Sequence, residues 1–414
     1  MSSSGRNFAT DSALTAKYTQ LRKNKAVLFG NSIEYYNYGD AAWQPLRPSP
    51  GSRGYVTHGN SMLGHRFEWV NRGVGGEDTG AFLLRLQSDL INVDAGYAII
   101  GGPTNDVTNI DGGFRTVAQT QAAYNQIWDA ATASGKFIIQ VTAPPRTGAT
   151  SNQKALRSQI NQWLRAQQML RKGFVIVDLE RATMDPTTND YVSGYSWDGI
   201  HFATPAAVAA GAEFARKIGP LIPQSQITLP ASDARNLLKN NGGSFSGTST
   251  AVPTGWTVNG ATGTDPTYGR IAFTDRPGQK LQVVMPNGSI RFYRSTTLQQ
   301  SLSEFAPGDQ LRFSVEYDIS NLDPAPAANT QALYATLELN GATVALDVEW
   351  SSDANPNSVS GTQNENMGAQ SRTGVLCTPT YTVPSGSSQT IAATFQTRGG
   401  GTYLFWNPTI EKLN

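Results

Sequence analysis

The feature that most constrains the fold is an alternation, through the first half of the chain, of short apolar runs with longer amphipathic segments. The apolar runs predict buried strands at 26–29, 67–71, 97–100, 137–141 and 174–179. The segments between and after them have helical periodicity and predict helices at 79–90, 115–133, 152–170 and 205–218. Strands that alternate with helices form right-handed crossovers, so the expected class is α/β, with a mostly parallel sheet covered on both faces.

The character of the sequence changes after about residue 230. Gly, Ser, Thr, Asn and Pro become dense, and short runs with period-two alternation predict strands at 280–285, 289–295, 310–319, 332–339, 342–350, 389–397 and 402–410. This pattern is typical of an all-β sandwich or jelly roll. We therefore expect an N-terminal segment at 1–23, an α/β domain at 24–222 and a β-sandwich domain at 234–414, each domain with its own core.

Composition argues against several classes of function. The net charge is +1, and neither half of the chain has the basic excess that a nucleic-acid partner would require. Cys377 is the single cysteine and there are three histidines, so we expect no disulfide, no metal site and no cofactor. The first residues lack the apolar region of a secretion signal and no later stretch resembles a membrane span. We expect no membrane insertion, and a chain that either needs no Sec export or has lost its signal.

Polar residues follow the predicted strands at four places. Ser32 comes just after the first strand, in the turn Gly-Asn-Ser, and Gly76 lies in the glycine-rich turn after the second. Asn105 follows the third strand, and Asp198 and His201 lie three residues apart just before the last helix. Function collects at the carboxyl ends of the strands in a parallel sheet, so we expect these residues to lie close together.

These residue types are those that acyl transfer requires. A serine hydroxyl is a weak nucleophile until a base takes its proton, and His201 can be that base if Asp198 holds its ring in the correct tautomer. The oxyanion that develops needs preorganised donors. The backbone N–H groups of Ser32 and Gly76 and the side-chain amide of Asn105 are the candidates.

The four segments, in this order, resemble the conserved blocks of the SGNH (GDSL-type) hydrolases, over roughly residues 24–219. The resemblance implies a flavodoxin-like three-layer α/β/α fold and cleavage of esters of lipids, thioesters or acetylated sugars. By motif position it implies a catalytic triad and an oxyanion hole without metal or cofactor. The triad would be Ser32, Asp198 and His201, and the oxyanion hole would be Ser32, Gly76 and Asn105.

Two departures from the family pattern stand out. Asn31 replaces the aspartate of the usual Gly-Asp-Ser, and two residues separate Gly102 from Asn105. Other readings of single residues also exist, because Ser32 could be a helix cap and Asp106 is a competing carboxylate that we assign to loop structure. We interpret His58 and His65 as surface or packing residues, with cleft lining as the alternative.

Aromatic residues favour a carbohydrate substrate over a lipid. The long 33–66 connection contains Tyr35, Tyr36, Tyr38, Trp43 and Tyr55. The second domain offers further candidate sugar platforms, namely Trp256, Tyr268, Tyr293, Trp350, Tyr381 and Trp406. Strand aromatics also serve as ordinary core, so both interpretations stay open.

The sequence as a whole leads us to expect a carbohydrate O-acetylesterase. The second domain is similar to carbohydrate-binding modules, and its opening is similar to jelly rolls of bacteriophage tail proteins and secreted polysaccharide enzymes. The leading hypothesis is a phage tailspike or tail-fibre esterase in the virion tail. It would act on an acetylated host polysaccharide, as a homotrimer or attached to other tail proteins. The alternatives are a secreted bacterial acetylxylan-type esterase and a non-catalytic receptor-binding tail protein.

Overall fold

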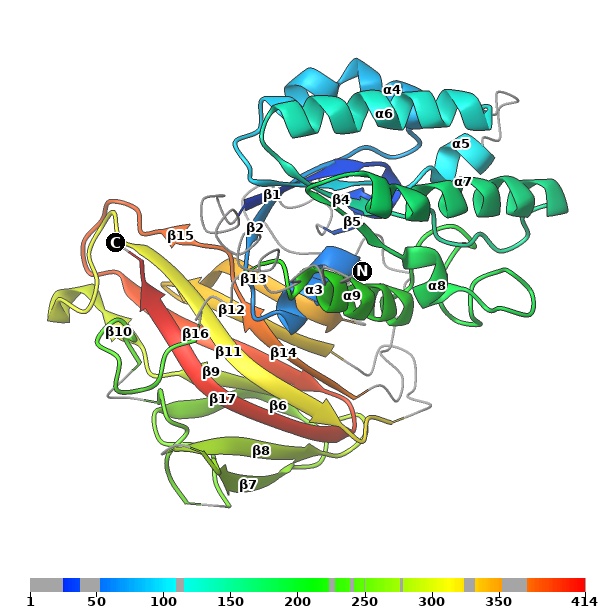
Figure 1. The fold of residues 1–414 in the computed structure, drawn as a ribbon. Helices are drawn as coiled ribbons and strands as arrows, with labels where there is room; N and C mark the ends of the chain where they lie inside the picture. The colour runs from blue at the N-terminus through cyan, green and yellow to red at the C-terminus, as the bar shows by residue number, and fades with distance from the viewer. Residues whose placement is uncertain are drawn as a thin grey trace, which may run out of the picture. The chain divides into compact units, whose positions relative to one another are not determined.

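The computed structural model describes residues 25–37, 53–108, 115–222, 228–238, 242–248, 250–275, 278–323, 332–351 and 371–413. Contacts between Cα atoms divide the chain into two compact units. The first holds the parallel sheet and most of its helices, and the second holds residues 36–65, the start of α9 (203–207) and everything from residue 226. Each unit is described by itself (Figure 1).

The first unit is built on a five-stranded parallel sheet whose strand order is β2-β1-β3-β4-β5. This order is that of the flavodoxin-like doubly wound fold. The fold class predicted from the sequence is confirmed, and the strands differ from the predicted runs only at their ends. They are β1 Lys25–Gly30, β2 Glu68–Gly73, β3 Tyr97–Ile100, β4 Phe137–Val141 and β5 Phe174–Val177.

Helices cover both faces of the sheet (Figure 1). On one face, Trp128 of α6 stacks on Trp163 of α7 with ring centroids 5.2 Å apart, above a core of alternate strand residues. Thr116 and Thr150 begin these two long helices with capping boxes, which explains why both start where the amphipathic pattern does. The helices of this unit are α2 Ser32–Tyr35, α4 Thr79–Leu84, α5 Thr104–Thr108, α6 Val117–Ala133, α7 Ser151–Leu170, α8 Leu179–Thr183 and, on the opposite face, α9 Thr204–Ile218.

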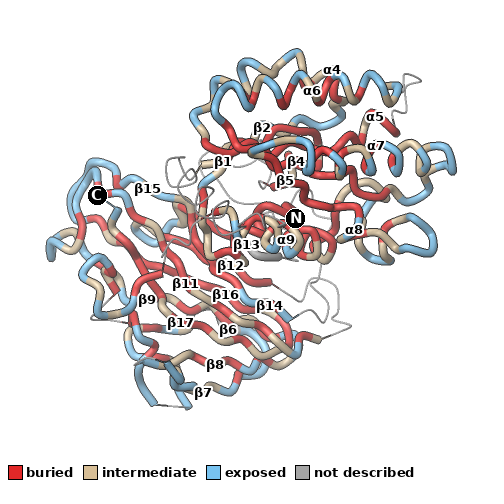
Figure 2. The backbone as a smooth tube through the Cα atoms, in the orientation of Figure 1, coloured by how far each residue is buried: buried red, intermediate tan, exposed pale blue. Residues whose placement is uncertain are grey.

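The second unit contains two six-stranded antiparallel sheets, which confirms the predicted β-sandwich. One sheet has the order β13-β12-β16-β9-β6 and the other β14-β11-β17-β8-β7, with β10 and β15 attached to β16 and β11. The strands are β6 Trp256–Thr262, β7 Thr267–Ala272, β8 Gln279–Met285, β9 Ile290–Ser295, β10 Leu298–Gln299, β11 Gln310–Ser320, β12 Ala332–Leu339, β13 Ala342–Ser351, β14 Arg372–Cys377, β15 Tyr381–Thr382, β16 Thr390–Arg398 and β17 Gly401–Lys412. Buried strand residues line the inside of the unit (Figure 2).

Most of the aromatic residues considered as sugar platforms turn inward. Trp256, Tyr293 and Trp406 are buried, and the ring of Phe395 joins the two sheets by packing against Tyr293 at 4.9 Å and Phe405 at 4.5 Å. For these three residues the core interpretation is correct. Tyr268 and Tyr381 are partly exposed, whereas the side chain of Trp350 and the residues Tyr38 and Trp43 lie outside the described part of the chain.

A helix from the long connection packs on the sandwich. The helix α3, Tyr55–Met62, belongs to the second unit, where Ser61 Oγ donates to the Val375 carbonyl at 2.8 Å. His58 is fully buried, with Nδ1 2.6 Å from Nη1 of Arg372, so its predicted packing role is confirmed. The predicted domain boundaries cut the chain once, whereas the contacts group residues 36–65 with the sandwich.

Candidate active site

Ser32 is placed by a turn that closes directly on the end of β1. The preceding residue, Asn31, is 1% exposed, and its side chain makes two hydrogen bonds. Its Nδ2 donates to the Gly102 carbonyl at 2.9 Å, and its Oδ1 accepts from the Ile33 N–H at 3.0 Å. An aspartate at this position could not donate to a carbonyl, so the departure from the family pattern ties the serine turn to the loop after β3.

Two glycines make room for a buried carboxylate beneath this turn. Oε2 of Glu34 accepts the backbone N–H of Asn31 at 3.1 Å, and Glu34 is fully buried. A Cβ atom at Gly30 or Gly101 would collide with the Glu34 carboxyl group. Both glycines are therefore explained by a close approach, which fixes the backbone immediately before Ser32.

The loop that carries Asp198 and His201 is held by its own hydrogen bonds. Oδ1 of Asp198 accepts the backbone N–H groups of Ile200 and His201 at 2.9 and 2.8 Å. Ser196 Oγ donates to the His201 carbonyl at 2.7 Å. Gly199 supplies the positive φ (88°) that this tight turn requires. The Asp-x-x-His spacing thus presents both side chains on the same side of one turn.

Ser32, His201 and Asp198 form a continuous hydrogen-bonded line. Ser32 Oγ lies 2.8 Å from His201 Nε2, and His201 Nδ1 lies 2.6 Å from Asp198 Oδ2. Because an ionised carboxylate only accepts, Nδ1 carries the proton of the second bond, which leaves Nε2 to accept from the serine. The three residues lie 169 and three positions apart in the chain, and the fold brings them together as the sequence predicted.

The Asp198 carboxyl group is held in its charged form. Burial acts to raise its pKa, but the hydrogen bonds from the His201 ring and from the backbone N–H groups of His201 and Ile200 outweigh burial and lower the pKa to about 2. Asp198 is therefore a carboxylate across the whole range in which a histidine base can work. It orients the His201 ring and stabilises the imidazolium that forms when the ring takes a proton.

The predicted oxyanion donors lie on loops that are joined to each other. Gly76 has φ 81°, a conformation that favours glycine, and it precedes Glu77, whose carbonyl accepts Asn105 Nδ2 at 2.8 Å. One N–H of the Asn105 amide remains for another acceptor. The Ser32 N–H is the first of α2, and first-turn N–H groups have no acceptor within their own helix. These groups are of the kind that stabilises an oxyanion.

Arg85 joins the serine turn to the Gly76 loop, and sequence reasoning missed it. Its guanidinium lies over the Phe29 ring at 4.4 Å, donates to the Gly30 carbonyl at 2.7 Å and to the Arg72 carbonyl at 2.6 Å, and pairs with Glu77 at 2.5 Å. It thereby connects the ends of β1 and β2 with the loop that carries Gly76. The predicted 79–90 helix is interrupted at this residue, which has φ −114°, and resumes as the π-helical turn Gln87–Ile91.

Asp106 has the structural role that we assigned to it. Its carboxylate accepts from the Thr79 hydroxyl at 2.5 Å and from the Thr120 hydroxyl at 2.8 Å, which holds the start of α4 against α6. Burial raises its pKa, and the threonine hydrogen bonds act in the opposite direction. Among the described residues no group of three His, Cys, Asp or Glu side chains could hold a metal ion, and none of the helices described could cross a membrane.

The model of the GDSL-like lipase and acylhydrolase family matches residues 28–206, a stretch that includes the whole triad. Residues 28–206 form a GDSL-type hydrolase domain. This GDSL domain is of the esterase or acylhydrolase type, and a β-sandwich follows it in the chain. No curated protein matches the chain.

Several solved structures are similar to the GDSL domain, at low identity. A lipase/acylhydrolase from Enterococcus faecalis is 22% identical, with a TM-score of 0.37, and the match covers 49% of this chain and 98% of that one. A mutant acetyl-xylooligosaccharide esterase from Geobacillus stearmophilus is 19% identical, with a TM-score of 0.39 and coverages of 47% and 94%. A GDSL-like lipase from Bacteroides thetaiotaomicron is 19% identical, with a TM-score of 0.36 and coverages of 50% and 94%.

Proposed function

We propose that the protein is a serine esterase that removes O-acetyl groups from a polysaccharide. The observation that carries the proposal is the line from Ser32 Oγ through His201 to Asp198, with separations of 2.8 and 2.6 Å. In the proposed reaction Ser32 attacks the acyl carbon and His201 takes its proton. His201 then gives the proton to the leaving sugar hydroxyl, and water repeats the sequence to release acetate.

An exposed tryptophan beside the triad supports a sugar as the leaving group. The Trp197 side chain precedes Asp198, is 40% exposed and stacks on the His201 ring with centroids 5.8 Å apart and an interplanar angle of 20°. Aromatic faces accept the C–H faces of sugar rings, so Trp197 offers a platform next to the reacting serine. The loops around Ser32 contain no long apolar run in the sequence, which favours acetyl over long acyl chains.

The biological setting is part of the same proposal. We favour a phage tailspike or tail fibre acting on a bacterial surface polysaccharide, as a homotrimer or attached to other tail proteins. Its support is the likeness of the opening of the second domain to tail-protein jelly rolls. A secreted acetylxylan-type esterase would use the same chemistry on another polymer. A complete and hydrogen-bonded triad argues against a purely receptor-binding role.

The experiment measures three products after incubation with an acetylated bacterial polysaccharide and, separately, with acetylxylan. Free acetate should rise while the number of reducing ends and the polymer length stay constant. Ser32→Ala should lower the rate at least about 10³-fold, because triad members act as a unit. Ser151→Ala, at an exposed serine that begins α7, serves as the matched control.

Three results would contradict the proposal. Shortening of the polymer would indicate a depolymerase, and preference for long-chain acyl esters would indicate a lipid substrate. Normal turnover by the Ser32→Ala variant would show that the nucleophile is wrong.

A further inference from the structure

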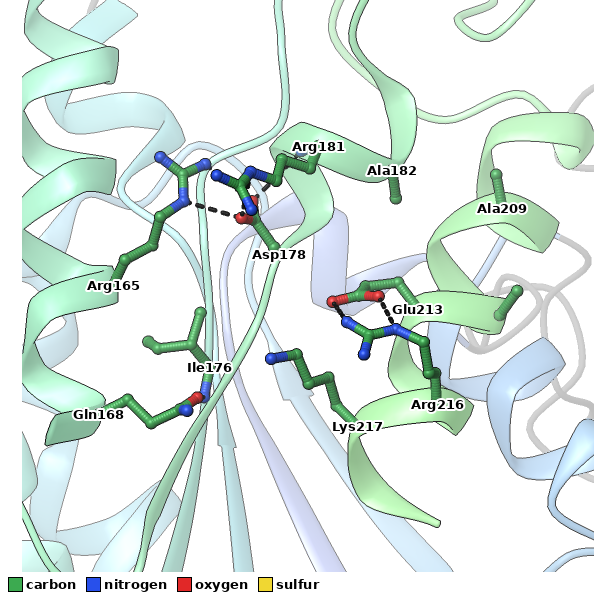
Figure 3. Close-up of a pocket in the computed structure, with 11 residues that line it drawn as sticks. Arg165, Gln168, Ile176, Asp178, Arg181, Ala182, Ala209, Glu213, Arg216 and Lys217 are labelled. Atoms are coloured by element: carbon green, nitrogen blue, oxygen red, sulfur yellow. Dashed lines mark hydrogen bonds and ion pairs between the residues drawn. The ribbon is translucent and has the colours of Figure 1, made fainter. Parts of the chain in front are cut away.

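A groove of about 650 Å³ runs along the outer edge of the first unit's sheet, between α7 and α9 (Figure 3). β5 is the last strand in the sheet order, and its Ile176 N–H is bound by Gln168 Oε1 at 2.9 Å. Small apolar residues, Ala182, Ala209 and Ala212, line the groove together with Ile176. None of the lining residues belongs to the triad.

The two carboxylates that line the groove are already committed to two arginines. Asp178 accepts from Arg165 at 2.7 and 2.8 Å, and Glu213 accepts from Arg216 at 2.7 and 2.8 Å. Although burial acts to raise the pKa of Asp178, the bonds from Arg165 hold it below its ordinary value. Both carboxylates are therefore charged and neutralised by bidentate partners.

Two further cations of the groove have no comparable partner. Arg181 is 78% exposed, and its Nε lies 3.6 Å from Asp178 Oδ2, the same oxygen that Arg165 binds at 2.7 Å. Within the part of the chain that the structure describes, no hydrogen bond or ion pair reaches Lys217. Figure 3 shows the Lys217 ammonium extending into the groove toward Ile176. The lining thus has four cations against two carboxylates, with the surplus at Arg181 and Lys217.

We propose that this groove is an accessory binding site for a carboxylate-bearing sugar residue of the polymeric substrate. Arg181 and Lys217 bind the carboxylate, and the alanines and Ile176 contact the ring. The volume falls in the range of sites for small organic ligands, which is about 300–1,000 Å³. The inference rests on the proposed function, because it assigns the substrate to the acidic polysaccharides.

The place of the groove in the fold suits a polymer. Asp178 follows β5 at the same sheet edge at which Ser32 follows β1. With β3 and β4 between them, β1 and β5 are three inter-strand spacings apart, about 14 Å. A polysaccharide chain can span this separation, so one acidic residue can occupy the groove while an acetylated residue lies at Ser32.

The test compares Lys217→Ala and Arg181→Ala with Lys172→Ala, which removes an exposed lysine outside the groove. Binding of oligogalacturonate, of a neutral oligosaccharide of equal length and of inorganic phosphate is titrated by calorimetry. KM and kcat are measured on acetylated acidic and acetylated neutral polymers and on p-nitrophenyl acetate. We expect each groove variant to weaken oligogalacturonate binding and to raise KM on the acidic polymer about fivefold to twentyfold, with kcat and small-ester turnover unchanged.

The outcomes separate this inference from the proposed function. Equal binding by the Lys217→Ala and Lys172→Ala variants would overturn it, as would neutral oligosaccharide binding as tightly as oligogalacturonate. Binding of phosphate but not of oligogalacturonate would replace the sugar with a free anion and also overturn it. If no polymer is deacetylated while oligogalacturonate binding still depends on Lys217, the groove assignment stands and the proposed esterase function fails.

Discussion

Replacing Arg85 with methionine tests whether the two halves of the active site are held by one side chain. The substitution keeps an apolar stem against Phe29 but removes the guanidinium, which binds the Gly30 carbonyl, the Arg72 carbonyl and the Glu77 carboxylate. The side chain is 13% exposed, so water can replace these bonds only in part. A hydrogen bond to a charged group contributes about 1.5–3 kcal/mol, and we expect a loss of roughly 2–4 kcal/mol in the free energy of unfolding.

The effect on catalysis should be separate from the effect on stability. Deleting one oxyanion donor typically costs about 10²–10³ in rate, but the Arg85→Met variant keeps the Gly76 N–H and only loosens its loop. We therefore expect kcat on p-nitrophenyl acetate to fall about 10- to 100-fold while KM changes little. Glu77→Gln, which keeps the carbonyl that binds Asn105, should give a smaller loss of kcat.

Arg171→Met is the matched control. Arg171 also lies over an aromatic ring, Trp128 at 4.8 Å, and binds Asp129 and Asn125, but it contacts no loop of the site in these bonds. Both variants are assayed at a temperature where circular dichroism shows each to be folded. If Arg85→Met retains kcat within twofold of the wild type, or loses it only in proportion to the control, the positioning role of Arg85 is refuted.

Three further predictions follow from the described contacts. Asn31→Asp should lower the free energy of unfolding by about 2–4 kcal/mol in urea denaturation, because it removes the donor to Gly102 and buries a second carboxylate near Glu34; unchanged stability would contradict this reading. Asp198 has a lowered pKa, so its contribution to stability is complete above its ordinary value of 3.8 and is lost as the pH falls toward 2. The acid limb of kcat/KM therefore belongs to His201, and an activity profile that is flat down to pH 3 would exclude a histidine base. Residues 1–225 produced alone should bind the dye ANS and aggregate, since α3 loses its partner β14; a monomeric fragment with native ester turnover would show that the α3 contact is dispensable.

The catalytic residues could be predicted because their geometry is largely local. The Asp198 and His201 side chains are oriented by backbone hydrogen bonds within four residues, and Ser32 is placed by a turn that any parallel strand can feed. The strand order places the carboxyl ends of neighbouring parallel strands together, so residues far apart in sequence meet at one edge. The two capping boxes likewise fix the starts of α6 and α7 from the sequence alone.

Other features depend on contacts between distant segments, for which the local sequence carries no signal. Arg85 looked like an ordinary polar position of a helix, yet its side chain ends at Gly30, 55 residues earlier in the chain. The helix α3 was read as part of a long loop because its buried side consists of polar residues such as His58 and Ser61, which are satisfied by β14 some 314 residues later. Trp256 and Trp406 had the same alternating pattern whether their rings faced solvent or core.

The sequence by itself determined the strands, the helices and the chemistry of the serine, histidine and aspartate, because each depends on periodicity or short spacing. Only the tertiary structure decided which carboxylate serves the histidine, which cations of the β5 groove have committed partners and which aromatics are core. Each of these outcomes depends on the competition of several groups for one partner, as when Arg165 takes the Asp178 oxygens and leaves Arg181 exposed. Such a competition is settled by distances in the folded chain, and the order of residues along the chain does not record them.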